Sequence, residues 1–230
     1  MGNKECKELK KREESMLKNG SLLLEKLISN FNGKYSNPIR IFSAKELQKA
    51  AGNYSGNLVF NHDELCNSKW YNGFLEGQVI SVRRYFGVLY TEYVINEFCL
   101  VAQISAQKSV LKLLGCCLGT EIPILVYEFP ANRNLNLLLS WKNRLKIGYE
   151  IASVMAYLHT AFPRPIIHRD INPYHFFLDQ DCVAKLSSFL FSISLPEGKT
   201  MVKDKDFGSL GYLAPELLSS GLYSERTDVF

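Results

Sequence analysis

The second half of the chain carries several short motifs in a fixed order. Helical spacing predicts a long helix over residues 141–159, whose apolar face is made of Leu145, Ile151, Val154, Met155 and Leu158. The segment Ile166-Ile167-His168-Arg169-Asp170-Ile171 follows, then an aromatic and acidic stretch at 176–179, then a segment with Ala214-Pro215-Glu216. Each string alone occurs by chance in unrelated proteins, whereas the order and spacing of all of them are restrictive. This series therefore constrains the fold more tightly than the composition does.

The series resembles the catalytic loop, the metal-binding turn and the Ala-Pro-Glu segment of protein kinases. The resemblance implies an α+β, protein-kinase-like fold with two lobes, and expected strands in the first half followed by helices in the second fit that class. In kinases the motif at Asp228-Val229-Phe230 starts the central helix of the large lobe, so we expect a C-lobe truncated before that helix. A truncated gene product, a fragmentary gene model and a chain completed by a partner remain open as explanations.

Further segments narrow the resemblance to one group of plant proteins. The chain resembles plant receptor-like kinases at residues 113–118, 125–129 and 144–147. It is similar to the plant ZRK-type cytoplasmic pseudokinases, relatives of the wall-associated kinases, at Asn19-Gly20, 37–43 and 69–73. The resemblance covers essentially the whole chain.

The first half of the chain predicts a mixture of helices and strands. An amphipathic helix over residues 4–31, ended by Asn32-Gly33, has an apolar stripe made of Met16, Gly20, Leu23, Leu24, Leu27, Ile28 and Phe31. Ser43 and Glu46 form a capping box for a short helix, and Glu76-Gly77 marks a hairpin turn. A further helix is expected at 91–106 and strands at 110–118 and 124–129. We divide the sequence into an N-terminal amphipathic helix with its extension at 1–34, a kinase-like N-lobe at 35–130 and a partial kinase-like C-lobe at 131–230.

Phosphate binding in a kinase depends on parts that this chain has mostly replaced. The region corresponding to the glycine-rich loop, residues 59–68, has no glycine and carries Asp63 and Glu64, which would repel phosphate. Arg83 stands where the strand lysine is expected, and it keeps the charge without the shape of an ammonium. Its helix partner is Glu97, and the pair either positions the helix or remains solvated. Arg83 and Glu97 are thus vestigial nucleotide-binding residues.

The catalytic loop keeps its base and loses its metal ligands. Asp170 occupies the catalytic-base position, where it can also persist because it organises the loop. Asn172 replaces the loop lysine, and His175 replaces the asparagine that would bind the second Mg²⁺, so we expect His175 to be packed or hydrogen-bonded. Ser188 replaces the aspartate that is the main magnesium ligand, while Phe189 keeps a packing role. Both metal positions are therefore degenerate, and we expect no bound metal and weak or absent binding of ATP and Mg²⁺.

Composition and the first residues bear on partners and location. The net charge of +4 is too small to indicate nucleic acid, and none of the six cysteines forms a C-x-x-C pair, so we expect reduced thiols that fill the core. No stretch reaches the roughly 18 apolar residues of a membrane span. The start of the chain is close to a myristoylation pattern, which makes Gly2 and Cys6 candidates for lipidation. Nearby basic residues favour peripheral contact with an anionic membrane. An ordinary cytosolic N-terminus is the alternative.

The resemblance also implies a function. ZRK-type relatives link an intracellular NLR-type immune receptor to receptor-like cytoplasmic kinases that pathogen effectors have modified. We therefore expect a catalytically inactive adaptor or decoy in plant innate immunity that is not an enzyme and lies in the cytoplasm or at the plasma membrane. The N-terminal helix and the segment at roughly 192–209 are the surfaces expected to bind. A weak or atypical ATP-dependent protein kinase and a truncated gene product without function stay open as alternatives.

Overall fold

The computed structural model describes residues 3–31, 39–64, 66–87, 90–104, 106–131, 140–205 and 207–230. The chain forms two compact units. The first combines Met1–Ser105 with Lys112–Phe129, and the second combines Ala106–Leu111 with Pro130–Phe230. The predicted α+β class with two parts is confirmed, because each unit contains both strands and helices.

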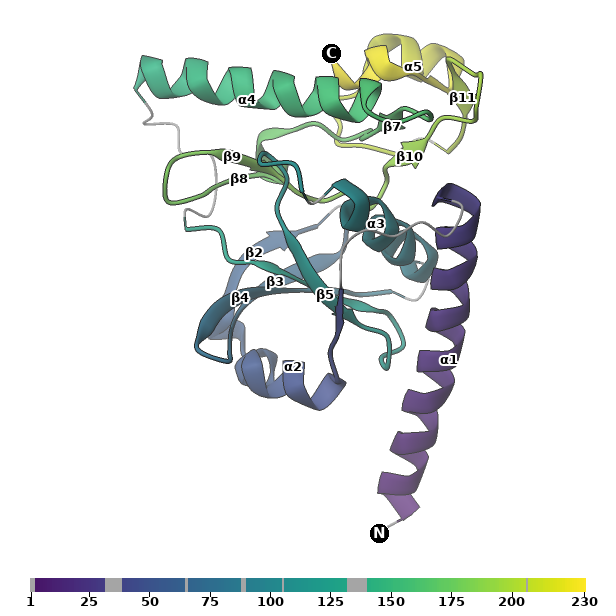
Figure 1. Cartoon of the computed structure of the whole chain (residues 1–230), viewed down its shortest axis with the longest axis vertical. Helices are drawn as coiled ribbons and strands as arrows, with labels where there is room; N and C mark the ends of the chain where they lie inside the picture. Colours follow the sequence, from purple (N-terminus) through teal and green to yellow (C-terminus); the bar gives the residue numbers. More distant parts are fainter. Residues whose placement is uncertain are drawn as a thin grey trace. The chain divides into compact units, whose positions relative to one another are not determined.

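A six-stranded sheet is the framework of the first unit (Figure 1). Its strands are β1 (Arg40–Ile41), β2 (Val59–Asp63), β3 (Ser68–Leu75), β4 (Gln78–Tyr85), β5 (Leu113–Cys117) and β6 (Ile124–Glu128). They lie in the order β1-β5-β6-β4-β3-β2, with β1 parallel to β5 and the other pairs antiparallel. One core cluster contains Tyr71, Val82 and Val126 of the sheet together with Leu47, which lies in the short helix Ala44–Ala50 that follows β1.

The hairpin predicted at Glu76-Gly77 joins β3 to β4. Both turn residues have positive φ, 50° and 82°, as a tight two-residue connection requires. The register pairs Trp70 with Arg83 and Ser68 with Tyr85. Because side chains alternate along a strand, these four residues share one face of the sheet. Arg83 and the polar side chains that bond to it lie on this face of the sheet, as described below.

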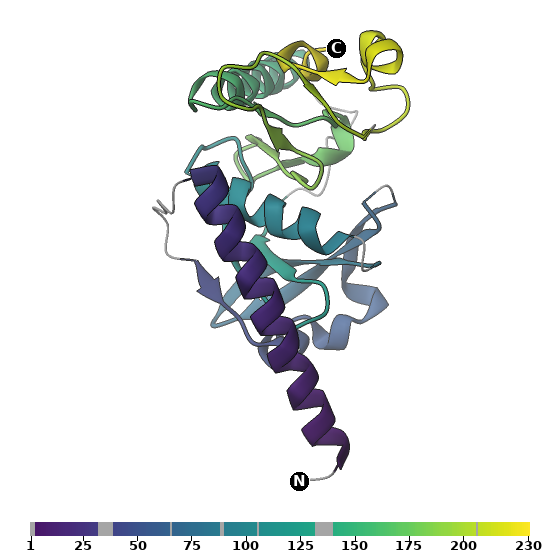
Figure 2. The same cartoon turned by 90° about the vertical axis from the view of Figure 1, so that its right-hand side faces the viewer.

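The described residues of the first unit form the α-helices α1 (Asn3–Phe31), α2 (Ala44–Ala50) and α3 (Thr91–Ile104). Two short 3₁₀ turns, Gly52–Tyr54 and Gly56–Leu58, connect α2 to β2. The predicted capping box of α2 is present, since Ser43 and Glu46 bond to each other's backbone N–H. Figures 1 and 2 show α1 running beside α3, with its first turns extending past the sheet.

Helix α1 confirms the prediction over 4–31, but the face that docks differs from the predicted apolar stripe. Leu24 and Ile28 are 62% and 63% exposed. Asn19 is instead fully buried, and its amide donates to the backbone oxygens of Leu118 (2.9 Å) and Thr120 (2.8 Å). A polar residue can take this place because the two carbonyls satisfy its NH2 group, although its Oδ1 accepts no hydrogen bond among the described residues, and a hydrophobic period does not reveal such acceptors. Through these contacts the segment assigned to 1–34 becomes part of the first unit, while its predicted end at 32–33 lies outside the described residues.

The second unit is built from shorter elements. Its helices are α4 (Trp141–Thr160) and α5 (Pro215–Ser220), with 3₁₀ turns η4 (Pro173–His175) and η5 (Glu225–Asp228). Its strands are β7 (Ile166–Ile167), β8 (Phe176–Leu178), β9 (Ala184–Leu186), β10 (Ile193–Ser194), β11 (Val202–Lys203) and β12 (Leu222–Tyr223). They form the antiparallel pairs β7–β10, β8–β9 and β11–β12. These short pairs hold the loops that carry the kinase-like motifs.

Helix α4 confirms the long helix predicted at 141–159. The helix buries Ile147, Val154, Met155 and Leu158. Leu145, which the pattern assigned to the buried face, is 59% exposed. It lies on a separate stripe with Trp141 and Tyr149, spaced four residues apart and also exposed, so the helical period alone was ambiguous about which stripe packs.

Candidate functional site

Arg83 is the centre of a polar cluster inside the first unit. Its side chain is fully buried on β4. The guanidinium donates to Glu97 Oε1 on α3 (3.1 Å) and to Asp63 Oδ2 at the end of β2 (3.1 Å). Its Nε–H donates to Ser68 Oγ (3.1 Å). All three side-chain nitrogens are therefore bonded within the unit, and the expected Arg83–Glu97 pair is buried rather than solvated.

Aromatic rings close the cluster. The guanidinium carbon of Arg83 lies 4.9 Å from the ring centroid of Trp70 and 4.7 Å from that of Tyr85. The hydroxyls of Tyr85 and Tyr127 donate to Glu97. Burial raises the pKa of both tyrosines far above the ordinary value, so they remain neutral donors. Burial lowers the pKa of Arg83, but the carboxylates of Glu97 and Asp63 offset this and hold the pKa above its ordinary value.

Two carboxylates already balance the charge of Arg83. The Glu97 side chain is fully buried and that of Asp63 is 11% exposed. The Asp63 carboxylate is held in place because its Oδ1 accepts from the Cys66 N–H (3.0 Å). A cation neutralised in this way offers little attraction to a phosphate, and the nearby negative charge opposes one. The sequence predicted that Asp63 would repel phosphate, but it did not predict that Asp63 would bind Arg83.

The pairing register of β2, β3 and β4 is the feature that brings the residues of this cluster together. Asp63 lies opposite Ser68, which lies opposite Tyr85. Alternation then places all three on the face of Arg83. The register itself depends on how the strands pair, so the cluster could be found only after the sheet was assembled.

In the second unit, Asp228 anchors the catalytic loop, residues 166–175. Its Oδ2 accepts from the His168 N–H (2.7 Å) and its Oδ1 from the Arg169 N–H (2.7 Å). Arg169 has φ 76°, a left-handed conformation that costs about 1–2 kcal/mol for a residue with a Cβ. His159 Nε2 also lies 3.1 Å from Asp228 Oδ2. The carboxylate of Asp228, which belongs to the motif Asp228-Val229-Phe230, thus fixes the backbone of the loop.

His168 is a buried structural residue of this loop. Its Nδ1 accepts from the Asp170 N–H (3.3 Å), while its Nε2 lies 3.2 Å from the Ser187 carbonyl oxygen. A carbonyl only accepts, so the proton is on Nε2. Burial lowers the pKa of His168 to about 4, which keeps the ring neutral. The Phe189 ring packs edge-on against it at 4.9 Å, the packing role expected for that phenylalanine.

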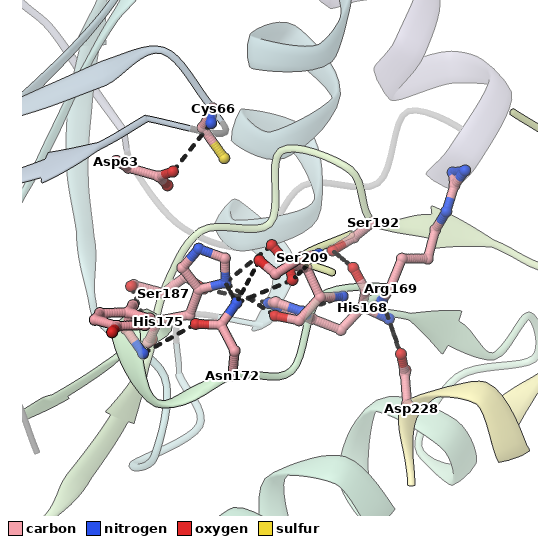
Figure 3. Close-up of polar contacts among 12 residues, drawn as sticks. Asp63, Cys66, His168, Arg169, Asn172, His175, Ser187, Ser192, Ser209 and Asp228 are labelled. Carbon is pink, nitrogen blue, oxygen red and sulfur yellow. Dashed lines mark hydrogen bonds and ion pairs between the residues drawn. The ribbon is translucent and has the colours of Figure 1, made fainter. Parts of the chain in front are cut away.

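Asp170 connects the catalytic loop to the segment around Ser209. Its Oδ1 accepts from Asn172 Nδ2 (2.9 Å) and from the Ser209 N–H (2.9 Å). Figure 3 shows Asn172, His175 and Ser209 gathered at this point. Among the described residues Oδ2 accepts no hydrogen bond, and it lies 3.5 Å from His175 Nδ1. The retained carboxylate therefore has an organising role that requires no substrate.

Neither degenerate metal position offers a carboxylate. His175 is buried, and its Nδ1 lies 2.9 Å from the backbone oxygen of Asp170, to which it must donate. This nitrogen therefore has no lone pair to offer a metal. Ser188 is buried with φ 65° and supplies a neutral hydroxyl. Mg²⁺ prefers hard oxygen ligands that include carboxylates, so the residues at these two positions do not fit it, and Arg83 does not fit a phosphate.

Only one of the two lipidation candidates lies in the described part of the chain. Cys6 is exposed on the helix, and Gly2 lies outside the described residues. All six cysteines are free thiols, four of them buried, and burial raises the pKa of Cys99 to about 12. No helix in the described part of the chain is both long and apolar enough to pass through a membrane.

Comparisons with known proteins agree with a protein-kinase-like fold. A family model described as protein tyrosine and serine/threonine kinase matches residues 88–230. The chain is 38% identical to non-functional pseudokinase ZED1 of Arabidopsis thaliana, over 96% of the chain and 68% of that protein. It is 40% identical to serine/threonine-protein kinase ZRK1, over 97% and 68%, and 41% identical to inactive serine/threonine-protein kinase ZRK12, over 97% and 59%, both of Arabidopsis thaliana.

The chain therefore belongs to the protein kinase family. Within this family, its relatives are kinases and pseudokinases of the plant ZRK group. It spans about two thirds or less of the length of these relatives. The names of these relatives include both inactive proteins and kinases.

Proposed function

We propose that this chain is a catalytically inactive, kinase-like protein that works by binding other proteins. In this proposal it is an adaptor or decoy in plant innate immunity. It links an NLR-type immune receptor to receptor-like cytoplasmic kinases modified by pathogen effectors. We place this activity in the cytoplasm, with peripheral contact at the plasma membrane.

The observation that carries the inactive state is the internal neutralisation of Arg83. An active kinase uses the charge at this position to hold the α- and β-phosphates of ATP. Here Asp63 and Glu97 both bond the guanidinium, and the side chain is fully buried. Releasing it toward a nucleotide would leave two carboxylates without their cation, at a cost of several kcal/mol.

The second unit supports the same proposal. Phosphoryl transfer depends mainly on positioning and charge neutralisation by bound metal ions. His175 and Ser188 supply no carboxylate at the two metal positions, and the Asp170 Oδ1 that remains already accepts two hydrogen bonds. Several contributions to catalysis therefore fail together.

Weak kinase activity is the second candidate function, and two observations favour it. Glu97 and Asp170 are retained, and the relative ZRK1 is named a serine/threonine-protein kinase. The two candidates differ in nucleotide binding, since a kinase must bind ATP with Mg²⁺. A third candidate, a gene product without function, predicts neither nucleotide nor protein binding.

Thermal denaturation of the full chain with and without millimolar ATP and Mg²⁺ separates the first two candidates. We expect no shift of the melting temperature, while an active protein kinase measured in parallel should shift upward. Incubation with radiolabelled ATP should give no phosphate transfer above a protein-free blank. A clear shift, together with transfer that Asp170→Asn abolishes, would overturn the inactive state.

The adaptor role has its own test. The full chain and a ZRK relative that binds a coiled-coil NLR-type receptor are each co-expressed with that receptor in plant leaves and purified by their tags. We expect the receptor to co-purify with both, and a receptor-like cytoplasmic kinase to join when its effector is present. Loss of the receptor from this chain alone would reject the adaptor role without bearing on catalysis.

A further inference from the structure

Arg169 of the catalytic loop has an acidic partner supplied by the chain itself. Its guanidinium donates to Asp204 Oδ2 (2.9 Å) and to the Lys205 carbonyl oxygen (2.8 Å). The guanidinium carbon also lies 4.1 Å from the ring centroid of Tyr223 and 5.0 Å from that of Phe207. The side chain of Arg169 is only 1% exposed, whereas that of Asp204 is 40% exposed. One buried cation therefore holds two consecutive residues of the segment that follows it.

Tyr223 fixes the same segment from another direction. Its hydroxyl accepts from the Phe207 N–H (2.7 Å) and lies within hydrogen-bond distance of the Lys205 and Phe207 carbonyl oxygens (3.2 and 3.1 Å). The ring of Phe207 stacks on that of Phe191 at 4.5 Å. The start of the stretch 202–209 is held by the pairing of β11 with β12, and its end by the hydrogen bond from the Ser209 N–H to Asp170. The described part of the stretch 202–209 is thus tied down along its length.

Kinase activation segments are commonly ordered when a phosphorylated residue pairs with arginine side chains. In this chain a native carboxylate pairs with Arg169. We propose that Asp204 takes the place of such a phosphate. The activation segment, residues 188–216, then folds into its docked arrangement without any phosphorylation of the chain. The segment is therefore held in one arrangement without a modifying kinase, and this inference holds whether or not the adaptor role does.

An ordinary surface ion pair would carry no such inference, because exposed pairs contribute between 0 and about 1 kcal/mol. This pair differs because the arginine is buried and bonds two groups at once. Removing the carboxylate leaves a buried cation with one partner fewer, which costs more than losing a solvated contact. Glu197 provides the comparison, since it lies in the same segment and is exposed.

Hydrogen–deuterium exchange of the full, unphosphorylated chain tests the proposal. Intact mass first establishes that no phosphate is present. We expect slow exchange across 202–209 in the wild-type protein, and exchange about tenfold faster there in D204N, with α4 unchanged. The matched variant E197Q should exchange like the wild type. Inorganic phosphate should slow exchange in D204N, compared with chloride at equal ionic strength, because it refills the anion position beside Arg169.

Each outcome decides the proposal. Fast exchange across 202–209 in the unphosphorylated wild type would overturn it, because the segment would then not be docked without phosphate. D204N that exchanges like E197Q would show that the carboxylate does not hold the segment. A faster D204N that phosphate leaves unchanged would show that a phosphate does not fit the position beside Arg169, so that Asp204 does not take the place of one, and would also overturn it.

Discussion

Arg83 and Arg169 are both buried arginines held by carboxylates, but they hold different things. Arg83 lies wholly inside the first unit, where Glu97 and Asp63 join α3 to the end of β2. Arg169 lies in the catalytic loop of the second unit, where a partly exposed Asp204 joins it to the activation segment. At Arg83, the charge that a kinase would present to phosphate is neutralised by carboxylates inside the unit. At Arg169, the positive charge that kinases also have at this position of the catalytic loop is retained.

The difference indicates which parts of a kinase survive the loss of its chemistry. Charges whose role is to bind nucleotide have become internal contacts, as at Arg83. Groups that shape the loops, such as His168 and Asp228, retain their bonds to the backbone. A protein selected for its surface needs the second kind and not the first, which is consistent with a binding role.

Replacement of Arg83 should have the largest effect. Arg83→Met leaves Glu97 and Asp63 buried without their cation, so we expect the free energy of unfolding of the first unit to fall by about 3–5 kcal/mol. Urea unfolding followed by the fluorescence of Trp70, in a W141F background, measures it, since Trp70 contacts the guanidinium.

The neighbouring arginine is the matched control for this change. Arg84 is only half-buried and contacts the rings of Tyr54 and Phe86. Arg84→Met should therefore cost less than about 1 kcal/mol. Equal losses of unfolding free energy in Arg83→Met and Arg84→Met would show that the buried, neutralised charge of Arg83 is no more important for stability than the half-buried charge of Arg84.

The second expected effect is a dependence of stability on pH that comes from His168. Its pKa is lowered by burial to about 4, against an ordinary 6.5. Between these values the unfolded chain binds a proton that the folded chain does not, so stability falls as the pH is lowered through this window. The loss is roughly 3 kcal/mol at pH 4 and absent above pH 6.5.

The variant His168→Gln isolates this contribution. Urea unfolding of both proteins from pH 7 to pH 4, followed by circular dichroism, should give a steeper decline for the wild type. Parallel declines would mean that His168 is solvated, and that the loop is less rigidly preserved than its contacts indicate.

The third and smallest effect concerns the anchor of the loop. Asp228→Asn keeps one oxygen acceptor but replaces the other with a donor facing a buried N–H of His168 or Arg169. We expect the second unit to lose about 2 kcal/mol of stability. Hydrogen exchange of peptides covering 166–175 should show it, with β4 unaffected. Unchanged exchange would show that the left-handed Arg169 conformation does not depend on Asp228.

Much of the local structure followed from the sequence. Helical periodicity predicted α1, α3 and α4, and the turn chemistry of Glu76-Gly77 predicted the β3–β4 hairpin. Periodicity was less reliable about which face packs, since Leu24 and Leu145 are exposed and Asn19 is buried. Burial of an amide depends on acceptors about a hundred residues away, which no local pattern encodes.

For the site, the sequence by itself determined which chemistry had been lost, because residue type alone excludes a carboxylate at Ser188 and His175. Only the tertiary structure decided what the remaining charges do. Asp63 and Glu64 are adjacent acids that look equivalent in the sequence, yet Asp63 is the one whose bond to Arg83 the fold fixes. Asp204 reaches Arg169 across 35 residues, and Asp228 reaches it across 59. The physical reason is that a buried ion pair depends on distance and exclusion of water, and both are set when distant strands and loops pack together.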